Sequence, residues 1–267
     1  MSESRPKIGL ALGAGGARGL AHIGVLEVFE KHSIPIDVIG GSSMGALVGS
    51  LYAVGHSPET LARFATLFKS RLYVDFTLPK MGLIQGNRIK ELIRMLAKKK
   101  NFEDLSLPVI AVATDLHSGE AVGIGTGPVA DAVRASISIP GVFVPEEWNG
   151  LTLVDGGVAE RVPANIVRGM GVDLVIAVDV AYYKKEPAID TIYDVILQSM
   201  DIMGRNLTKY KEMDADIIIK PISVYYRSVN YDNSNAIIEA GRLAAEKNIC
   251  EIKERMHNWK ENGHEDN

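Results

Sequence analysis

The chain has 267 residues and is 46% hydrophobic, which is enough for one large domain with a substantial core. Its formal charge of −4 and pI near 5.9 argue against a nucleic-acid-binding protein. Cys250 is the single cysteine, so a disulfide framework and a cysteine-based zinc site are both excluded. No signal-peptide pattern and no run of ~18 apolar residues occurs, and we expect a cytoplasmic protein.

Short apolar runs alternate with longer amphipathic segments along the chain. We expect the apolar runs to be strands, at 7–12, 36–40, 109–114, 151–154, 174–180 and 217–219. We expect the amphipathic segments to be helices, at 20–31, 44–54, 129–137, 189–213 and 235–256. Strands that alternate with helices predict an α/β fold with three layers, α/β/α, around a mainly parallel central sheet.

No break in composition marks a second domain. We therefore expect one main domain over 7–220, with a helix and a polar tail over 221–267 packed on it.

The segment 56–104 differs in character from the rest of this domain. It holds ten Lys or Arg against five Asp or Glu, a net charge of +5, so the remainder of the chain carries −9. Helices are expected at 58–69 and 87–99. The loop between them is expected to expose six apolar or aromatic side chains: Leu72, Tyr73, Phe76, Leu78, Met81 and Leu83.

Two interpretations of this basic insert are open. In one, it is a helical excursion packed on the sheet with a solvated basic face. In the other, it is a cap or an interfacial element. Basic side chains around exposed apolar ones suit an anionic lipid surface, so the second interpretation predicts peripheral contact with a membrane.

A G-x-S-x-G pattern, formed by Gly41, Ser43 and Gly45, lies between the second expected strand and its following helix. A strand, a sharp turn and a helix form the context in which this pattern marks a nucleophilic serine. Glycines on both sides avoid clashes at a strained turn, and the helix N-terminus favours developing negative charge. The sequence thus predicts Ser43 as a nucleophile, with Ser42 pointing elsewhere; the alternative is a tight turn with incidental serines.

A second Gly-rich turn, GAGGARG, follows the first expected strand and also precedes a helix. It fits the dinucleotide pattern G-x-G-x-x-G at Gly13 and Gly15 but has Arg18 at the last position, and Asp37 precedes the second strand instead of ending it. An anion-binding nest of backbone N–H groups fits better. Opposite a serine, such a nest is an oxyanion hole, with Gly15, Gly16 and Ala17 as donors. Arg18 is expected to hold the loop or a substrate headgroup.

A base for the serine is harder to find among the histidines. The six candidates lie in helices, in turns or in the charged C-terminal region, and none suits a conventional triad: His22, His32, His56, His117, His257 and His264. Asp155 directly follows an apolar strand and precedes Gly156 and Gly157. An acid at this strand end is expected at the same sheet edge as Ser43. The alternative is a D-G-G turn, in which Asp and Gly are favoured anyway. Asp115, at the end of another strand, is a competitor with the same geometry.

These motifs, GAGGARG, GSSMG and DGG in this order, together resemble the patatin-like phospholipases, a family of serine lipid acyl hydrolases with a Ser–Asp dyad. The stretch ASISIPGVFVPEE is similar to the family's A-S-x-x-x-P-x-x-F-x-P segment. The resemblance covers about residues 7 to 180, and RGLAHIGVLE and the overall length look like those of compact bacterial members. The one departure is Ala14, where the family often has glycine.

The resemblance implies a patatin-like α/β/α fold with Ser43 as nucleophile and Asp155 as general base. It also implies an oxyanion hole from Gly15, Gly16 and Ala17, and no metal or other cofactor. The motif positions that support these roles are Gly13, Arg18, Gly19, Gly41, Gly45, Gly156 and Gly157. The implied function is hydrolysis of fatty-acyl esters of lipids, of the phospholipase A or lysophospholipase type, through an acyl-serine.

Other functions are open at this point. An acyl transferase or thioesterase would also use such a serine, although the malonyl transacylase family relies on a downstream histidine and arginine that are hard to find here. A lipid-binding regulatory protein without catalysis would use the Gly-rich loop to bind an anion, and nucleotide binding would show as a thermal shift with NAD or ATP.

Overall fold

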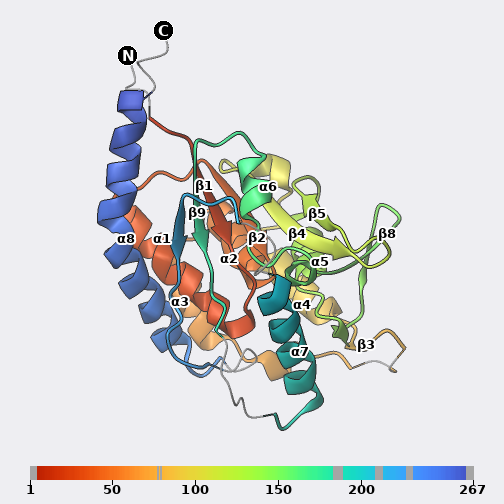
Figure 1. Ribbon diagram of the computed structural model, residues 1–267. Helices are drawn as coiled ribbons and strands as arrows, with labels where there is room; N and C mark the ends of the chain where they lie inside the picture. Colours follow the sequence, from red (N-terminus) through yellow and green to blue (C-terminus); the bar gives the residue numbers. More distant parts are fainter. Residues whose placement is uncertain are drawn as a thin grey trace.

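The computed structural model describes residues 5–76, 78, 80–182, 189–207, 213–226 and 231–262. Within these ranges, eight strands form one mixed sheet at the centre of the molecule (Figure 1). They are β1 Ile8–Leu12, β2 Val38–Ser42, β4 Val109–Asp115, β5 Ala121–Ile124, β7 Glu146–Trp148, β8 Leu151–Asp155, β9 Leu174–Val178 and β10 Ile217–Ile219. Two further strands, β3 Gly82–Ile84 and β6 Gly141–Phe143, pair with each other in parallel.

Helices cover both faces of the main sheet, which confirms the predicted fold class. The α-helices are α1 Ala21–Lys31, α2 Met44–Ala53, α3 Pro58–Leu67, α4 Asn87–Leu96, α5 Val129–Ser136, α6 Ala164–Arg168, α7 Ile192–Leu207 and α8 Ser234–Asn262. The 3-10 helices are η1 Gly16–Leu20, η2 Ser70–Leu72, η3 Phe102–Asp104 and η4 Gly156–Val158. No helix in the described ranges is both long and apolar enough to cross a bilayer.

The alternation of side chains along β1 explains the three layers. Ile8, Leu10 and Leu12 join the larger apolar cluster beneath α1, α2, α5 and α8, whereas Ala11 faces the smaller cluster beneath α6. Both faces of this strand are therefore buried, which accounts for its continuous apolar sequence.

The order of hydrogen-bonded strands is β10, β9, β1, β2 and β4, and all of these neighbours are parallel. The remaining strands are antiparallel to their partners: β5 and β8 pair with β4, and β7 pairs with β8. The strand that ends at Asp155 is therefore antiparallel to its neighbour β4, within a sheet that was expected to be mainly parallel. The reason lies in the hairpin between β7 and β8, where Asn149 and Gly150 have φ of 48° and 82° and reverse the chain in two residues.

The register shows how β8 nevertheless brings Asp155 to the right place. Residues 111–114 of β4 pair with β5, residues 109–112 pair with β2, and residues 113–115 pair with β8. A strand has two edges, so β2 and β8 must share the edge opposite β5. Ser42 ends β2 opposite Val112, and Asp155 ends β8 opposite Ala113. The carboxyl ends of the two strands thus meet along one edge of β4.

The other expected elements fall within a few residues of the observed ones. The strands β3, β5, β6 and β7 and the short helix α6 were not expected from the sequence. The expected helix over 189–213 is observed as α7, and residues 208–212 lie outside the described ranges. The last residues of the polar tail, 263–267, which include His264, also lie outside them.

Candidate active site

Ser43 stands at a strained turn between β2 and α2. Its φ of 54° and ψ of −119° lie in a region that non-glycine residues rarely adopt. The backbone N–H of Ser43 donates to Ser136 Oγ at 2.8 Å, and Ser136 Oγ in turn donates to the Val112 carbonyl at 2.6 Å. A buried hydroxyl on α5 therefore connects the turn to β4. The sequence analysis did not single out Ser136, although it lies in the A-S-x-x-x-P segment.

The hydroxyl of Ser43 points at Asp155. Ser43 Oγ donates to Asp155 Oδ2 at 2.6 Å, and the N–H of Gly157 donates to the other carboxylate oxygen at 2.8 Å. The backbone of Asp155 is also fixed, because its N–H donates to Ser138 O and its carbonyl accepts from Thr114 Oγ1. The structure thus brings the predicted nucleophile and the predicted base into direct contact.

Burial changes the proton affinity of this carboxyl group. Asp155 is 2% exposed, and burial raises its pKa to about 6, although the hydrogen bonds from Ser43 and Gly157 and the charge of Arg161 act in the opposite direction. A carboxylate with this pKa is a better base than an exposed one and is still ionised at neutral pH.

The Gly-rich loop between β1 and α1 carries backbone N–H groups beside this pair. The N–H of Gly13 donates to Val178 O, and the N–H of Ala14 donates to Arg161 O. The next three N–H groups, of Gly15, Gly16 and Ala17, precede or begin η1, and within the described ranges none of them has a backbone acceptor. Gly15 and Gly16 line the cavity that holds Ser43, whereas Ala17 is fully buried.

His22 fixes the position of the Gly-rich loop by a hydrogen bond. Its Nε2 lies 2.8 Å from the Gly13 carbonyl, so this nitrogen carries the proton. The side chain is fully buried, and burial lowers its pKa to about 4. The imidazole is therefore neutral at physiological pH and serves to position the loop, a role that its place inside an expected helix did not reveal.

Arg18 also holds the loop. It is 2% exposed and donates to the carbonyls of Gly15 and Tyr182. Its guanidinium pairs with Asp201 of α7 at 3.1 Å, and Arg161 pairs with the same carboxylate at 2.8 Å. Of the two roles expected for Arg18, the observed contacts are those of a residue that holds the loop.

The close packing around the site explains two of the motif glycines. A Cβ at Gly45 would lie 2.1 Å from the Leu12 carbonyl oxygen, and one at Gly156 would lie 2.1 Å from the Val112 carbonyl oxygen. Neither backbone atom can move aside without breaking the sheet, so a side chain is excluded at both positions. Gly41 lies at the end of β2, and Gly19 lies in η1 against Met44.

The competing carboxylate, Asp115, does not reach the serine. Its carboxylate accepts hydrogen bonds in the turn after β4. Those from the side chain and the N–H of Ser118, and then that from the N–H of His117, lower its pKa. Two of the other histidines are engaged elsewhere, His32 with Glu246 and His56 with the Leu96 carbonyl. Asp115 is therefore a turn residue in this structure.

A cavity of about 710 Å³ opens above the Ser43–Asp155 pair. Its walls are mainly apolar and come from α2, from α3 and α4 of the basic insert, and from α7. A site of this size and lining suits an apolar ligand with a few polar groups. Among the described residues, no group of three or more His, Cys, Asp or Glu is placed to hold a metal ion.

The family to which the chain belongs can now be stated. Residues 10–168 match the family model of the patatin-like phospholipases, and the chain is a member of that family. An uncharacterized NTE family protein of Mycobacterium tuberculosis is 37% identical over 216 residues, which cover 80% of this chain and 60% of the relative. Human patatin-like phospholipase domain-containing protein 6 is 38% identical over 181 residues, which cover 65% of this chain and 13% of the relative.

The chain thus spans only part of these relatives, about 60% of the mycobacterial protein. Among solved structures, that of VipD from Legionella pneumophila has a TM-score of 0.49 and 14% identity, and covers 91% of this chain and 66% of VipD.

Proposed function

We propose that this chain is a serine acyl hydrolase that cleaves fatty-acyl esters of lipids, of the phospholipase A or lysophospholipase type. The observation that carries the proposal is the contact of 2.6 Å between Ser43 Oγ and a buried Asp155 carboxylate, at the base of an apolar cavity. Membership of the patatin-like phospholipase family supports a lipid ester as the substrate.

In the first half of the reaction, Asp155 accepts the proton of Ser43 Oγ as this oxygen attacks the acyl carbonyl carbon. The resulting oxyanion lies against the free N–H groups of the Gly-rich loop, of which Gly15 and Gly16 line the cavity. When the carbon–oxygen bond to the alcohol breaks, Asp155 returns the proton to the alcohol and an acyl-serine remains.

In the second half, Asp155 accepts a proton from water, which attacks the acyl-serine. The fatty acid leaves and Ser43 regains its proton from Asp155. The pKa of Asp155, about 6, suits a group that must accept and return a proton in each half of the cycle.

Single substitutions test this assignment in an assay with p-nitrophenyl butyrate and a lysophospholipid. We expect Ser43→Ala and Asp155→Asn each to lower kcat/KM by more than about 10³-fold, because each removes one partner of the pair. Asp115→Asn is the matched control, since Asp115 ends the neighbouring strand but its carboxylate accepts hydrogen bonds from its own turn; the activity of this variant should stay within about threefold of the wild type.

Retention of full activity by Ser43→Ala would exclude the mechanism. Release of products only when a thiol acceptor replaces water would favour an acyl transferase, and failure of Ser43 to react with a fluorophosphonate would favour a binding protein without catalysis.

We further propose that the protein contacts membranes peripherally through the basic insert, 56–104. Seven of its ten basic side chains are exposed, and three of these, Lys69, Arg71 and Lys80, lie in the same loop after α3 as the exposed apolar residues. The main-domain limits of 7–220, with α8 packed on this domain, are likewise part of this proposal.

A further inference from the structure

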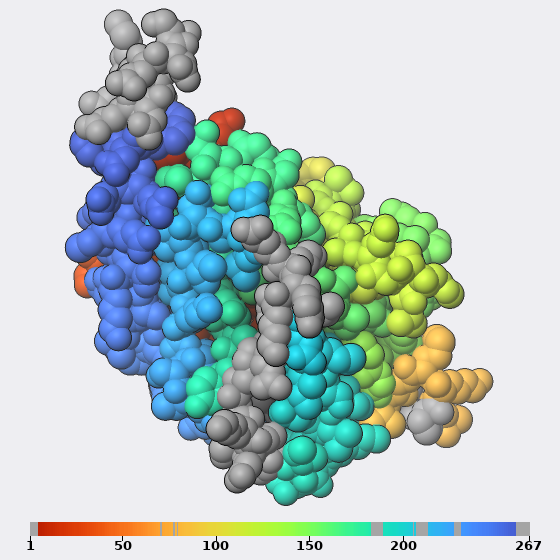
Figure 2. All heavy atoms as spheres, viewed as in Figure 1, coloured from red at the N-terminus to blue at the C-terminus, as the bar shows by residue number. Residues whose placement is uncertain are grey.

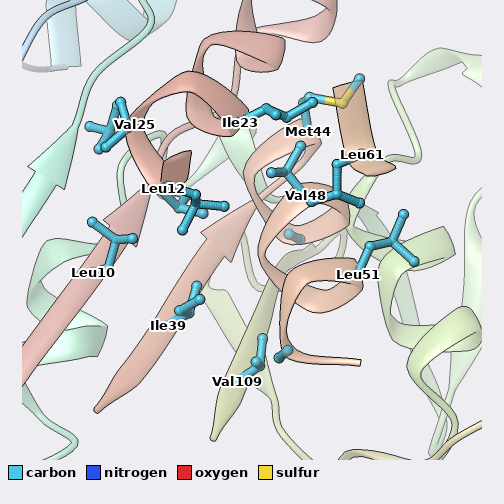
Figure 3. Close-up of a cluster of buried hydrophobic side chains, with 14 of the residues drawn as sticks. Leu10, Leu12, Ile23, Val25, Ile39, Met44, Val48, Leu51, Leu61 and Val109 are labelled. Carbon is cyan, nitrogen blue, oxygen red and sulfur yellow. The ribbon is translucent and has the colours of Figure 1, made fainter. Parts of the chain in front are cut away.

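The cavity follows α2 away from the nucleophile. Ser43 immediately precedes this helix, and Met44, Leu47, Val48 and Leu51 of the helix all line the cavity. Their spacing places them on one face of α2, and Figure 3 shows Val48 and Leu51 on the same side of the helix, with Leu61 of α3 close by. One continuous apolar wall therefore extends from the reactive oxygen along the helix.

The polar groups of the cavity come from other elements. Arg18, Arg161 and Asp201 belong to the Gly-rich loop, the segment after η4 and α7, and they form one ion-pair network. The part of the cavity lining that comes from α3 and α4 is instead mainly apolar, with Leu61, Phe64, Leu92 and Leu96 among its residues. An acyl chain gains free energy against apolar side chains, whereas covering the ion-pair network with it would cost those charges their hydration. The separation of apolar and charged lining therefore directs the acyl chain along α2 and the alcohol part of the substrate towards α7.

Hydrogen bonds fix both ends of α4, whose apolar side chains line the cavity. His56, just after α2, donates from Nε2 to the Leu96 carbonyl at 2.7 Å, and its ring lies edge-on to Phe64 with centroids 5.3 Å apart. The start of α4 is fixed as well, because the buried Arg134 side chain donates to the carbonyls of Gln85 and Gly86. The part of the cavity lining that α4 forms is thus fixed at both ends of this helix.

We propose that side chains of α2 determine which acyl-chain lengths bind and that Leu51 sets the longest chain that fits. This inference rests on the proposed acyl hydrolase function. At 1.5 Å per residue, Val48 lies about 7 Å and Leu51 about 12 Å along the helix from Ser43. An acyl group bound to Ser43 passes Val48 first and reaches Leu51 later. Side-chain volume at the two positions therefore limits the chain at two different lengths.

The test compares kcat/KM for p-nitrophenyl butyrate, octanoate, dodecanoate and palmitate in one fixed detergent. Leu51→Phe should lower the ratio of dodecanoate to butyrate by at least about tenfold, because methylenes that no longer fit lose their burial. Val48→Phe should move the cut-off to shorter chains than Leu51→Phe does. Leu51→Ala should shift the preference towards palmitate.

Leu26→Ala is the matched control, because Leu26 is fully buried on α1 and does not line the cavity. This variant should lose a similar amount of stability and keep the wild-type ratio. Leu51→Ala only removes atoms and cannot overpack the cavity, so it tests the idea even if the Phe variants fail to fold.

Active variants with unchanged ratios, or a Leu26→Ala ratio that shifts as much as that of Leu51→Ala, would overturn the role of α2 while leaving the hydrolase function intact. A wild-type protein that cleaves none of the four esters would overturn both.

Discussion

The carboxyl group of Asp155 is held where water has almost no access, and its protonation should control the reaction. Its pKa is raised to about 6, so the fraction in the basic form increases as the pH rises through this value. We expect kcat/KM on a short ester to fall tenfold per pH unit below about pH 6 and to level off above it. A pH profile of the wild type from about pH 4 to pH 8 measures this.

The same shift has an opposite effect on stability. A folded-state pKa above the unfolded value of 3.8 favours the protonated form of the folded protein. The stabilisation from this group is complete below about pH 4 and is lost as the pH rises through about 6, a change of about 3 kcal/mol. Asp155→Asn should abolish this component in urea unfolding. A plateau of activity that extends down to pH 4 would contradict the assignment of Asp155 as base.

The nucleophile and the base could be predicted from the sequence because each lies in a short motif with a mechanical reason for its glycines. Ser136 and His22 could not be identified in this way. Ser136 acts through a hydrogen bond to Ser43, 93 positions away in the chain, which exists only when α5 packs against the sheet. His22 contacts Gly13 only because the loop turns back over the start of α1. A single serine or histidine outside a motif does not indicate in the sequence which distant residue it will contact.

The parallel strands of the main sheet and β8 were predictable from their apolar runs, whereas β5, β6 and β7 were not. β5, β6 and β7 are three or four residues long and only partly buried, so they lack a clear pattern. The sequence did contain a signal at Asn149 and Gly150. An Asn-Gly pair flanked by segments in which apolar and polar residues alternate is typical of a two-residue hairpin. That dipeptide would have predicted the reversed direction of β8.

The loop after α3 is the most exposed apolar part of the insert. Phe76 is 77% and Leu78 is 82% exposed, and the segment around β3 projects from the body of the molecule (Figures 1 and 2). Four of the six side chains expected to be exposed there are exposed, whereas Tyr73 and Leu83 are partly buried. The helices of this insert also line the cavity, and contact with a membrane stays a prediction.

We expect binding to vesicles that contain phosphatidylglycerol, and weaker binding at high salt, because the charges around the loop are exposed. The double variant Phe76→Ser, Leu78→Ser should bind at least about tenfold more weakly in a co-sedimentation assay. Leu243→Ser on α8 is the control, as it removes an apolar, 56% exposed side chain that does not belong to the insert. Equal binding to vesicles of phosphatidylcholine alone would contradict the electrostatic part of this proposal.

The long helix α8 contributes to the stability of the whole domain through its contact with α1. The two helices lie side by side (Figure 1), and their backbones touch, since a Cβ at Gly24 would lie 2.0 Å from Ile238 O and one at Gly241 would lie 2.0 Å from Ala21 O. α1 follows the Gly-rich loop directly. The packing of α8 therefore supports the element on which the loop depends.

Gly241→Val should force the two helices apart and lower the free energy of unfolding by about 1–3 kcal/mol or more. Valine has a better helix propensity than glycine, so a loss of stability must come from the interface. Ala236→Val at an exposed position of the same helix should cost less than about 1 kcal/mol. Thermal unfolding followed by circular dichroism measures both, and an unchanged melting temperature for Gly241→Val would show that the helices do not make this contact.

The meeting of β2 and β8 along one edge of β4 has a consequence for how this molecule can be altered. The hydroxyl and the carboxylate are carried by strands that approach from opposite directions, so the position of each depends on a different strand. The connection at Asn149 and Gly150 belongs to the strand that carries the acid and not to the strand that carries the serine, so a change there should act on the position of Asp155 first. The exposed β7–β8 hairpin is accordingly a site at which substitutions could change proton transfer from outside the cavity.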